Sequence, residues 1–377
     1  MNEILSELTQ IQQALCFVLL AAVLVQLFYT LFFYLRLLLH KPKNSPTTLP
    51  PVSVVICARN ESENLMNFIP VIMEQDYPKF EVIVVNDSSW DDSEDILKAL
   101  QVRFSNLKVL RLNEDLHRMT GKKFALTMGI KGAAHERLLL TDADCFPMSS
   151  DWISNIMAET VNEDEVVLGV SLMEREKGFR KNFFRFESIH TAINYSSFAL
   201  AKSPYMGVGR NLSYTKEKFF SVGGFKKHMH ITGGDDDLFI NEIAASSTIK
   251  LNANIEGHTT TKSPNKWGEW WSQKRRHLNT SSLYKFKNKF LLGLEPLSWW
   301  LMWFSVIVLF VLRTPTLLVI TPVVLRYLLL YGTFIAIGRK WKAVDAVWAM
   351  PFWELVLNIT KPAVLISNMI SKPKRWM

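Results

Sequence analysis

Three long apolar stretches constrain the fold of this 377-residue chain more than any other feature. Residues 8–35 and 296–312 carry no charged side chain, and residues 316–337 carry a single one, Arg326. Because a helix of about 20 apolar residues spans a bilayer, the sequence predicts one span near the start and a helical hairpin near the end. A mean hydropathy of only +0.09 then implies that the remainder is an ordinary charged domain.

Basic residues beside these stretches indicate how the chain crosses the membrane. Arg36 and Lys41 follow the first stretch, and Arg339, Lys340 and Lys342 follow the last. Lysine and arginine are enriched on the cytoplasmic side, so we expect the charged domain in the cytoplasm and the N-terminus outside a bacterial inner membrane. A cleaved secretory signal fits less well, because acidic residues precede the first stretch and no small-residue cleavage site follows it.

Two further segments mix charged and apolar residues, and both are predicted to lie as helices on the inner leaflet. They are residues 285–292, where lysines alternate with aromatic residues, and residues 343–376, which end in a basic cluster. Arg326 has two interpretations. It serves a polar pathway through the membrane, or it pairs or snorkels near an interface.

The whole chain is therefore expected to have three parts, residues 1–48, 49–290 and 291–377. Its three cysteines are odd in number and far apart, which excludes a disulfide framework or a Cys-x-x-Cys zinc site. The net charge of +8 is compatible with nucleic acid, but the basic residues gather beside the apolar stretches. Anionic membrane lipid is thus the simpler partner, and no nucleic acid is expected.

The central part alternates short apolar runs with helical patterns, which predicts parallel βαβ units and an α/β fold. The predicted strands are residues 52–57, 80–85, 107–111 and 137–141. The predicted helices are residues 63–74, 93–104 and 121–134. Ligands of such sheets gather beyond the carboxyl ends of the strands, where this chain places many of its polar residues.

Two carboxylates follow the fourth predicted strand directly, Asp142 and Asp144. Their mutual repulsion requires a cation, and oxygen ligands suit Mg²⁺ or Mn²⁺ bound together with substrate phosphates. Asp91 and Asp92 precede a predicted helix and are better explained as N-terminal caps.

A pair of lysines, Lys122 and Lys123, opens a predicted helix after Gly121. The pair is either an anion site at the helix N-terminus or a solvated lysine pair. Neither Cys145 nor His258 is assigned a role, since a lone cysteine or histidine more often belongs to the packing or a loop. No Walker pattern occurs, which excludes a P-loop enzyme.

Taken in order, the polar motifs resemble those of the membrane-bound family 2 glycosyltransferases, which have the GT-A fold and include cellulose, chitin and hyaluronan synthases. The matching motifs are Ala58-Arg-Asn-Glu61, Asp87, Gly121-Lys122, Asp142-Ala-Asp144, Gly233-Gly-Asp-Asp-Asp237 and Gln273-Lys-Arg-Arg276. The resemblance covers nearly the whole chain, and it implies a Rossmann-like, mostly parallel nucleotide-diphospho-sugar transferase domain with transmembrane and interfacial helices at both ends.

The resemblance also implies roles for individual residues. Arg59, Glu61, Asp87 and Lys122 would lie at the nucleotide, commonly uridine, and Asp142 and Asp144 would hold the metal, with Asp144 as the direct ligand. The second acid of the family's acidic motif is the general base. The register of this motif is open, so the base is Asp236 or Asp235. The alternative is a helix N-terminus that merely carries acids.

Gln273, Arg276 and His277 match the family's QxxRW motif, with His277 in place of Trp. Arg276 would contact the diphosphate and Gln273 the acceptor, and Arg210 and Asn211 would face the acceptor. In processive synthases that Trp stacks on the growing chain, so its absence favours single addition. The tryptophans at 267, 270 and 271 are either other stacking surfaces or an interfacial aromatic belt.

These observations predict an inverting glycosyltransferase that transfers one sugar from a nucleotide sugar, UDP-linked, to a glycan or lipid-linked acceptor hydroxyl. Two other functions stay open. One is a processive polysaccharide synthase, and the other is a non-catalytic membrane scaffold that binds nucleotide sugars.

Overall fold

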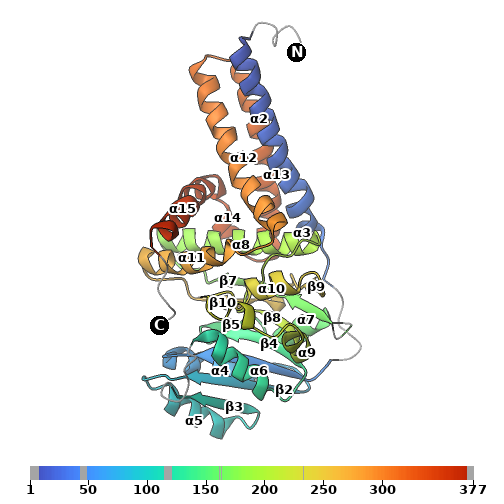
Figure 1. The fold of residues 1–377 in the computed structure, drawn as a ribbon, viewed down its shortest axis with the longest axis vertical. Helices are drawn as coiled ribbons and strands as arrows, with labels where there is room; N and C mark the ends of the chain where they lie inside the picture. The colour runs from blue at the N-terminus through green and yellow to red at the C-terminus, as the bar shows by residue number, and fades with distance from the viewer. Residues whose placement is uncertain are drawn as a thin grey trace. The chain divides into compact units, whose positions relative to one another are not determined.

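A computed structural model describes residues 8–42, 49–113, 121–160, 162, 164–231 and 233–371. It divides into two compact units (Figure 1). The helical unit comprises the described parts of residues 1–39 and 285–360, and the sheet unit comprises those of residues 40–284 and 361–377. The predicted basic end at 372–376 lies outside the described residues.

The helical unit contains three helices that are long and apolar enough to cross a membrane, at Gln10–Leu39, Phe286–Val311 and Thr316–Lys340. The three predicted apolar stretches are thus helices of the length and composition that a membrane span requires. The first combines α2 (Gln10–Phe28), the π-helical turn η1 (Tyr29–Tyr34) and α3 (Leu35–Leu39). The other two are α12 (Phe286–Val311) and α13 (Thr316–Lys340), and α14 (Val344–Val347) and α15 (Met350–Ile370) follow.

Apolar side chains from three helices form the core of this unit. Leu19 and Val23 of α2 pack with Met302 and Leu309 of α12 and with Val319 of α13. Polar contacts fix the N-terminal end of α2, since the side-chain amide of Gln12 donates to the carbonyl of Leu312 (3.0 Å) and to Thr314 Oγ1 (3.2 Å) in the hairpin turn.

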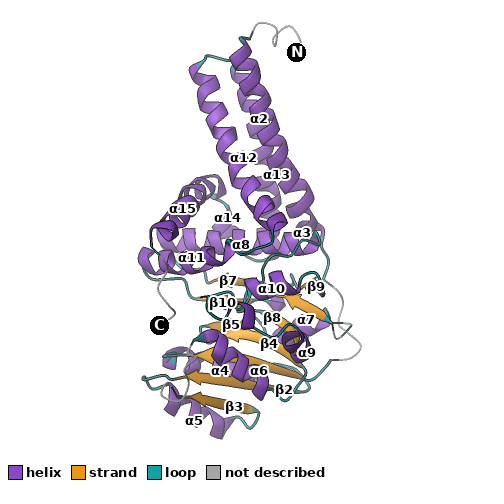
Figure 2. Ribbon diagram, in the orientation of Figure 1, coloured by secondary structure: helices purple, strands orange, loops and turns teal. Residues whose placement is uncertain are grey.

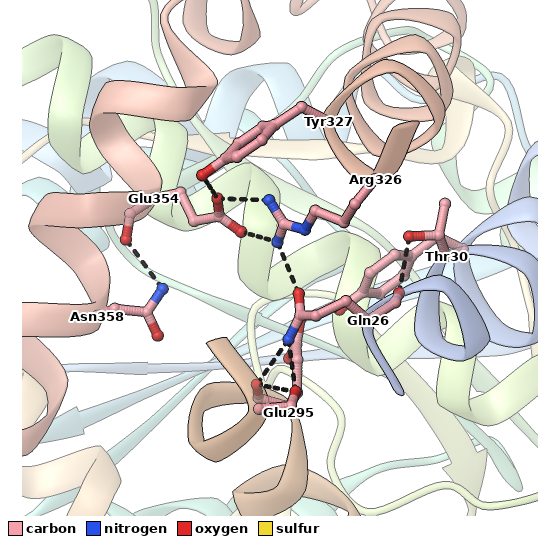
Figure 3. A network of polar contacts seen from close by, with 9 residues as sticks. Gln26, Thr30, Glu295, Arg326, Tyr327, Glu354 and Asn358 are labelled. Atoms are coloured by element: carbon pink, nitrogen blue, oxygen red, sulfur yellow. Dashed lines mark hydrogen bonds and ion pairs between the residues drawn. The ribbon is translucent and has the colours of Figure 1, made fainter. Parts of the chain in front are cut away.

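A buried polar network joins α2, α13 and α15 (Figure 3). The guanidinium of Arg326 forms a bidentate pair with Glu354 and donates to Gln26 Oε1 at 2.7 Å. Tyr327 donates to the same carboxylate at 3.0 Å. Arg326 is 1% exposed. Of its two interpretations, this structure fits the one in which Arg326 is paired.

One prediction for this unit is wrong. Residues 285–292 do not form a separate interfacial helix, because α12 runs without a break from Phe286 to Val311 and contains Pro296. Pro296 removes one backbone hydrogen bond from α12, but the helix continues through this position.

The sheet unit holds all the described strands (Figure 2). The main sheet has seven strands in the order β3-β2-β1-β4-β8-β6-β9, and a second sheet has three in the order β5-β10-β7. The first sheet contains β1 (Val52–Ala58), β2 (Phe80–Asp87), β3 (Leu107–Leu112), β4 (Arg137–Asp142), β6 (Glu165–Leu168), β8 (Leu212–Thr215) and β9 (Thr248–Leu251). The second contains β5 (Cys145–Pro147), β7 (Ser171–Met173) and β10 (Thr259–Thr261).

The four predicted strands are confirmed, and they pair in parallel. Every residue of β1 is buried, as expected for a strand covered on both faces. β8 was not predicted, and it runs antiparallel to β4 and β6. The sheet is therefore mixed and mostly parallel. Because β8 runs the opposite way, the residues that precede it lie at the carboxyl end of β4.

Helices connect and cover these strands. The three predicted ones are α4 (Ser62–Met73), α5 (Ser93–Arg103) and α6 (Lys122–Gly132). The others are α7 (Trp152–Ala158), α8 (Phe179–Leu200), α9 (Lys216–Ser221), α10 (Asp237–Ile243) and α11 (Trp267–Ser281). Short 3₁₀ turns lie at η3 (Lys226–His228) and η4 (Ile255–Gly257). Side chains of β1, β2, α4, α5 and α7 form one buried apolar cluster around Trp152.

Candidate active site

The carboxyl ends of three neighbouring strands bring the predicted polar residues to one edge of the sheet. Cys57 of β1 pairs with Asp142 of β4 on one side, and Ala58 pairs with Asn86 of β2 on the other. The side chains that follow these positions are therefore neighbours although they are far apart in the sequence.

A single ammonium group links two of the acidic motifs. Lys122 Nζ lies 2.8 Å from Asp142 Oδ1 and 3.0 Å from Asp235 Oδ2. Lys122 is the first residue of α6, and Gly121 before it has φ of 109°, a left-handed conformation that favours glycine. At this helix end, where an anion site was predicted, the ammonium of Lys122 pairs with two carboxylates of the protein itself. Lys122 is therefore not a solvated lysine.

The three consecutive aspartates have different surroundings. Asp235 is paired with Lys122, as described above. Asp237 is buried, and it accepts hydrogen bonds from the hydroxyls of Thr280 and Tyr284. Asp236 accepts from the backbone N–H of Gly209 at 2.9 Å, and its other oxygen accepts from the N–H of Asp237 at 2.7 Å.

These surroundings move the pKa values of the acids in opposite directions. Burial, together with the negative charges of Asp235 and Asp237, raises the pKa of Asp236 to about 7. Burial also acts on Asp235, but Lys122 outweighs it and holds the pKa of Asp235 below its ordinary value. Asp236 is therefore suited to exchange a proton near neutral pH, and burial raises the pKa of Asp237 as well.

Two glycines with left-handed backbone conformation directly precede the acidic run. Gly233 and Gly234 have φ of 81° and 84°. A Cβ at Gly234 would lie 2.6 Å from Leu238 Cδ1, so a larger residue there would clash as well as be strained. A Cβ at Gly209 would stand 3.4 Å from Asp235 Oδ2, which is an ordinary contact, so the space at Gly209 does not by itself require glycine.

Asp144 lies in the loop between β4 and β5 and is held by two neighbours. Thr261 Oγ1 of β10 donates to Asp144 Oδ2 at 3.1 Å, and Cys145 Sγ donates to Asp144 Oδ1 at 3.2 Å. Arg210 is close enough that, against the effect of burial, Cys145 and Asp144 raise its pKa. Arg210 thus belongs to this edge of the sheet.

The predicted metal site has few protein donors. Among the described residues, no group of three or more His, Cys, Asp and Glu side chains is placed to hold a metal ion. Asp142 and Asp144 supply carboxylates, and Glu61 is near enough that they contribute, after burial, to raising its pKa. Two carboxylates fit an ion that completes its shell with substrate phosphates and water, which is typical of Mg²⁺ and Mn²⁺.

The remaining predicted nucleotide residues lie beyond β1 and β2. Arg59 Nη1 is 3.9 Å from Asp87 Oδ2, and the Arg59 guanidinium stands over the ring of Trp90 at 5.5 Å. Glu61 accepts a hydrogen bond from Asn64 Nδ2 at 2.6 Å. Asp91, taken as a helix cap, does accept from the N–H of Ser93, but also from that of Ser62.

Helix α11 carries the predicted Gln273, Arg276 and His277. Thr280, on the same helix, holds α11 to Asp237. A Cβ at Gly233 would lie 3.9 Å from the backbone oxygen of Arg276, so α11 runs beside the glycines that precede the acidic run. Gln273 and Arg276 are half-buried and His277 is exposed. Among the described residues, no hydrogen bond or ion pair joins these three side chains to Asp142 or Asp235.

Two expectations do not fit the structure. Asn211 does not face an acceptor, because it is fully buried, donates to the carbonyls of Val170 and Gly257 and accepts from Trp152. Trp270 belongs to no aromatic belt, since it is 2% exposed and stacks on Phe184 of α8. Both residues hold the packing of the sheet unit.

Sequence reasoning missed Thr261 and the backbone N–H of Gly209. A threonine in a three-residue strand carries no motif signal, and the Gly207-Val-Gly209 spacing gives only a weak one. It also missed that Lys123 is buried, with its ammonium bound to the carbonyls of His228 (2.6 Å) and Ile231 (3.1 Å).

Comparison with known sequences agrees with this geometry. Residues 53–225 match the family described as Glycosyl transferase family 2. The match includes β1, α6 and the Asp142–Asp144 loop. Residues 53–225 are thus similar to a family 2 glycosyltransferase domain.

Two relatives illustrate the sequence likeness. The chain is 29% identical over 197 residues to the glycosyltransferase AglE of Haloferax volcanii, across 50% of this chain and 60% of that protein. It is 32% identical over 113 residues to a poly-beta-1,6-N-acetyl-D-glucosamine synthase of Staphylococcus epidermidis, across 29% and 25%. The chain thus spans less than two thirds of the length of these relatives.

A solved structure shares the fold. The mannosyltransferase PcManGT from Pyrobaculum calidifontis, in complex with GDP-Man and Mn²⁺, superimposes with a TM-score of 0.57 at 18% identity. The likeness covers 90% of this chain and 99% of that one. The fold of the sheet unit is therefore of the GT-A type.

Proposed function

We propose that this protein is an inverting, metal-dependent glycosyltransferase of the bacterial inner membrane that adds one sugar to an acceptor hydroxyl. The donor is a nucleotide sugar, UDP-linked, and the acceptor is a glycan or a lipid-linked sugar. The observation that carries the proposal is the Asp142–Lys122–Asp235 contact, which joins one of the proposed metal residues to the acidic run that contains the proposed base.

Asp236 is assigned as the general base. Its pKa of about 7 suits proton removal at neutral pH, whereas Asp235 is committed to Lys122 and Asp237 to two hydroxyls. The acceptor oxygen attacks the anomeric carbon as its proton passes to Asp236. The new C–O bond forms while the bond from the anomeric carbon to the phosphate oxygen breaks, and the nucleoside diphosphate departs.

The departing diphosphate requires positive charge. Asp142 and Asp144 would hold Mg²⁺ or Mn²⁺, which supplies Lewis-acid stabilisation of that leaving group when bound. Lys122 offers an ammonium at the start of α6, and Arg276 offers a guanidinium suited to bidentate phosphate contacts. Arg59, Glu61 and Asp87 would receive the nucleoside, and Gln273, His277 and Arg210 would lie toward the sugar and acceptor.

Two substitutions test the assigned roles. Asp236→Asn should lower transfer at least a hundredfold with nearly unchanged donor binding, because only the proton acceptor is lost. Asp144→Asn should instead weaken metal-dependent binding of the donor. Full metal-dependent transfer by both variants would refute the proposal. Binding of UDP and Mn²⁺ by the wild-type protein without any turnover would support the scaffold instead.

The donor is tested by a thermal-shift panel of UDP- and GDP-sugars with Mn²⁺ on detergent-purified protein. Stabilisation by UDP-sugars is expected. Stabilisation by GDP-sugars alone would overturn the proposal that the donor is UDP-linked. Both classes belong in the panel because PcManGT, which shares the fold, was solved with GDP-Man.

Processive synthesis is the second candidate, favoured by the match to a poly-beta-1,6-N-acetyl-D-glucosamine synthase. His277, in place of the motif's Trp, supports single addition. The length of the product on a gel separates the two, since single addition gives one band and processive synthesis gives a ladder.

The proposed orientation puts the sheet unit in the cytoplasm and the α12–α13 turn outside. The basic residues after the first and third spans support it. In intact cells of a variant without native cysteines, Arg313→Cys should react with a membrane-impermeant maleimide and Lys342→Cys should not. The reverse pattern would overturn the orientation.

A further inference from the structure

The second lysine of α6 has no part in the mechanism described above. Lys123 is 6% exposed, and its ammonium donates to the backbone carbonyls of His228 and Ile231 at 2.6 and 3.1 Å. Burying an ammonium against two neutral carbonyls is costly, and an apolar side chain would avoid that cost. The position therefore calls for an explanation beyond packing.

The segment that Lys123 holds leads directly to the acidic run. Residues 225–231 stand between two glycine pairs in left-handed conformation, Gly223-Gly224 and Gly233-Gly234. Glycine pairs do little to fix the direction of the chain, because glycine accepts a wide range of backbone angles. The direction in which Asp235 and Asp236 leave the segment must then be fixed by other contacts.

The backbone hydrogen bonds of residues 225–231 are local. Ile231 N–H donates to the carbonyl of His228 and His228 N–H to that of Phe225. Two lysines tie the segment to other elements. One is the buried Lys123, and the other is Lys227, a 72% exposed side chain that pairs with Glu242. Exposed pairs contribute little, so the buried tie is the stronger of the two.

We propose that Lys123 is a positioning residue, whose ammonium fixes the backbone of residues 228–231 and thereby the placement of Asp235 and Asp236. Lys122 holds the side chain of Asp235, and Lys123 holds the chain just before it. One helix end thus fixes the acidic run at two points. This inference rests on the proposed role of Asp236 as the base.

The test compares Lys123→Met with Lys227→Met in the full-length protein. Lys123→Met should lower kcat about tenfold or more while the donor KM changes less than about twofold, because a misplaced base slows the chemical step. Hydrogen exchange of the peptide that covers residues 226–236 should accelerate. Lys227→Met, which breaks the exposed tie of the same segment, should behave as wild type in both measurements.

Two more variants separate positioning from general damage. Lys123→Arg keeps a cation that donates to both carbonyls and should restore much of kcat. Lys123→Gln keeps an uncharged amide donor and should give an intermediate kcat. This variant replaces Lys123→Met in the test if the Met variant does not fold. Wild-type kcat and exchange in Lys123→Gln or Lys123→Met would overturn the proposal, as would a loss confined to donor KM.

Asp236→Asn, measured in parallel, separates the two proposals. If that variant is inactive while Lys123→Met is normal, only the positioning role fails. If Asp236→Asn retains full turnover, the proposed base fails, and the positioning role fails with it.

Discussion

Three adjacent aspartates are proposed to differ in function, because each carboxylate has different partners. Asp235 contacts an ammonium, Asp237 accepts from two hydroxyls, and Asp236 accepts from two backbone N–H groups. Backbone N–H groups hold a carboxylate in place and leave it able to accept a further proton. The assignment of Asp236 as the base thus follows from its partners and not from its place in the motif.

The raised pKa of Asp236 gives a pH prediction. A general base acts when deprotonated, so kcat should rise with pH through an acid limb near pH 7. Asp235→Asn removes a neighbouring negative charge that raises the pKa of Asp236, and it frees Lys122 to act on Asp236. The limb should therefore move to lower pH. A kcat–pH series on both proteins checks this, and an unmoved or raised limb would contradict the assignment.

At the scale of elements, one carboxylate joins four segments at the opposite end of the sheet. Glu81 of β2 accepts from Ser53 of β1 (2.6 Å) and from the N–H of Ala134 before β4 (2.5 Å). It also pairs with Lys108 of β3 at 2.6 Å. Burial alone would raise the pKa of Glu81, but these partners outweigh it and lower the pKa.

The lowered pKa of Glu81 predicts how stability depends on pH. A carboxylate with a depressed pKa in the folded protein stabilises it above its unfolded pKa, about 4.3, and this stabilisation is lost as pH falls. Glu81→Gln should cost about 1–3 kcal/mol at pH 7 and less at pH 4, because the loss begins below the unfolded pKa and continues as the pH falls through the lower folded pKa. Thermal unfolding in detergent at both values measures the difference, with the exposed Glu63→Gln as control. An equal cost at both pH values would show that Glu81 contributes no charge-dependent stability.

The sequence predicted those elements whose signal is local. β1, β2 and β4 are continuous apolar runs, which buried parallel strands require, and their helices follow within a few residues. β5, β7 and β10 have three residues each and exist only through pairing with one another. No periodicity can develop over three residues, so the second sheet could not be predicted.

The site was predictable to a similar extent. The residue types at the strand ends indicated acids, a lysine and a metal, because the topology of parallel sheets gathers strand ends. The partners of each acid could not be inferred, since Thr261, Thr280 and Tyr284 reach the site from distant segments. The predicted acceptor role of Asn211 was wrong for the same reason, because a polar residue next to a motif can equally be buried.

At the scale of the whole molecule, the Arg326–Glu354 pair is the clearest determinant of the helical unit (Figure 3). Removing one member of a buried pair leaves an uncompensated charge, which costs about 3–5 kcal/mol in soluble proteins. Replacing both with apolar residues costs far less. The pair therefore specifies how α13 and α15 meet more than it stabilises their contact.

The corresponding prediction concerns single and double variants. Arg326→Met and Glu354→Met should each lower the melting temperature in detergent more than the double variant does, because only the single variants leave a buried charge unpaired. Fluorescence-detected gel filtration after heating measures all three. A double variant less stable than either single one would contradict this account.

The same pair has a consequence for the order of synthesis. Arg326 is made 28 residues before Glu354, so in the proposed membrane arrangement α13 would insert before its cation can meet that carboxylate. Gln26 of α2, already synthesised, is the partner that Arg326 could meet first. Helix α2 would then provide a temporary hydrogen-bond acceptor for the arginine, until α15 emerges and completes the pair.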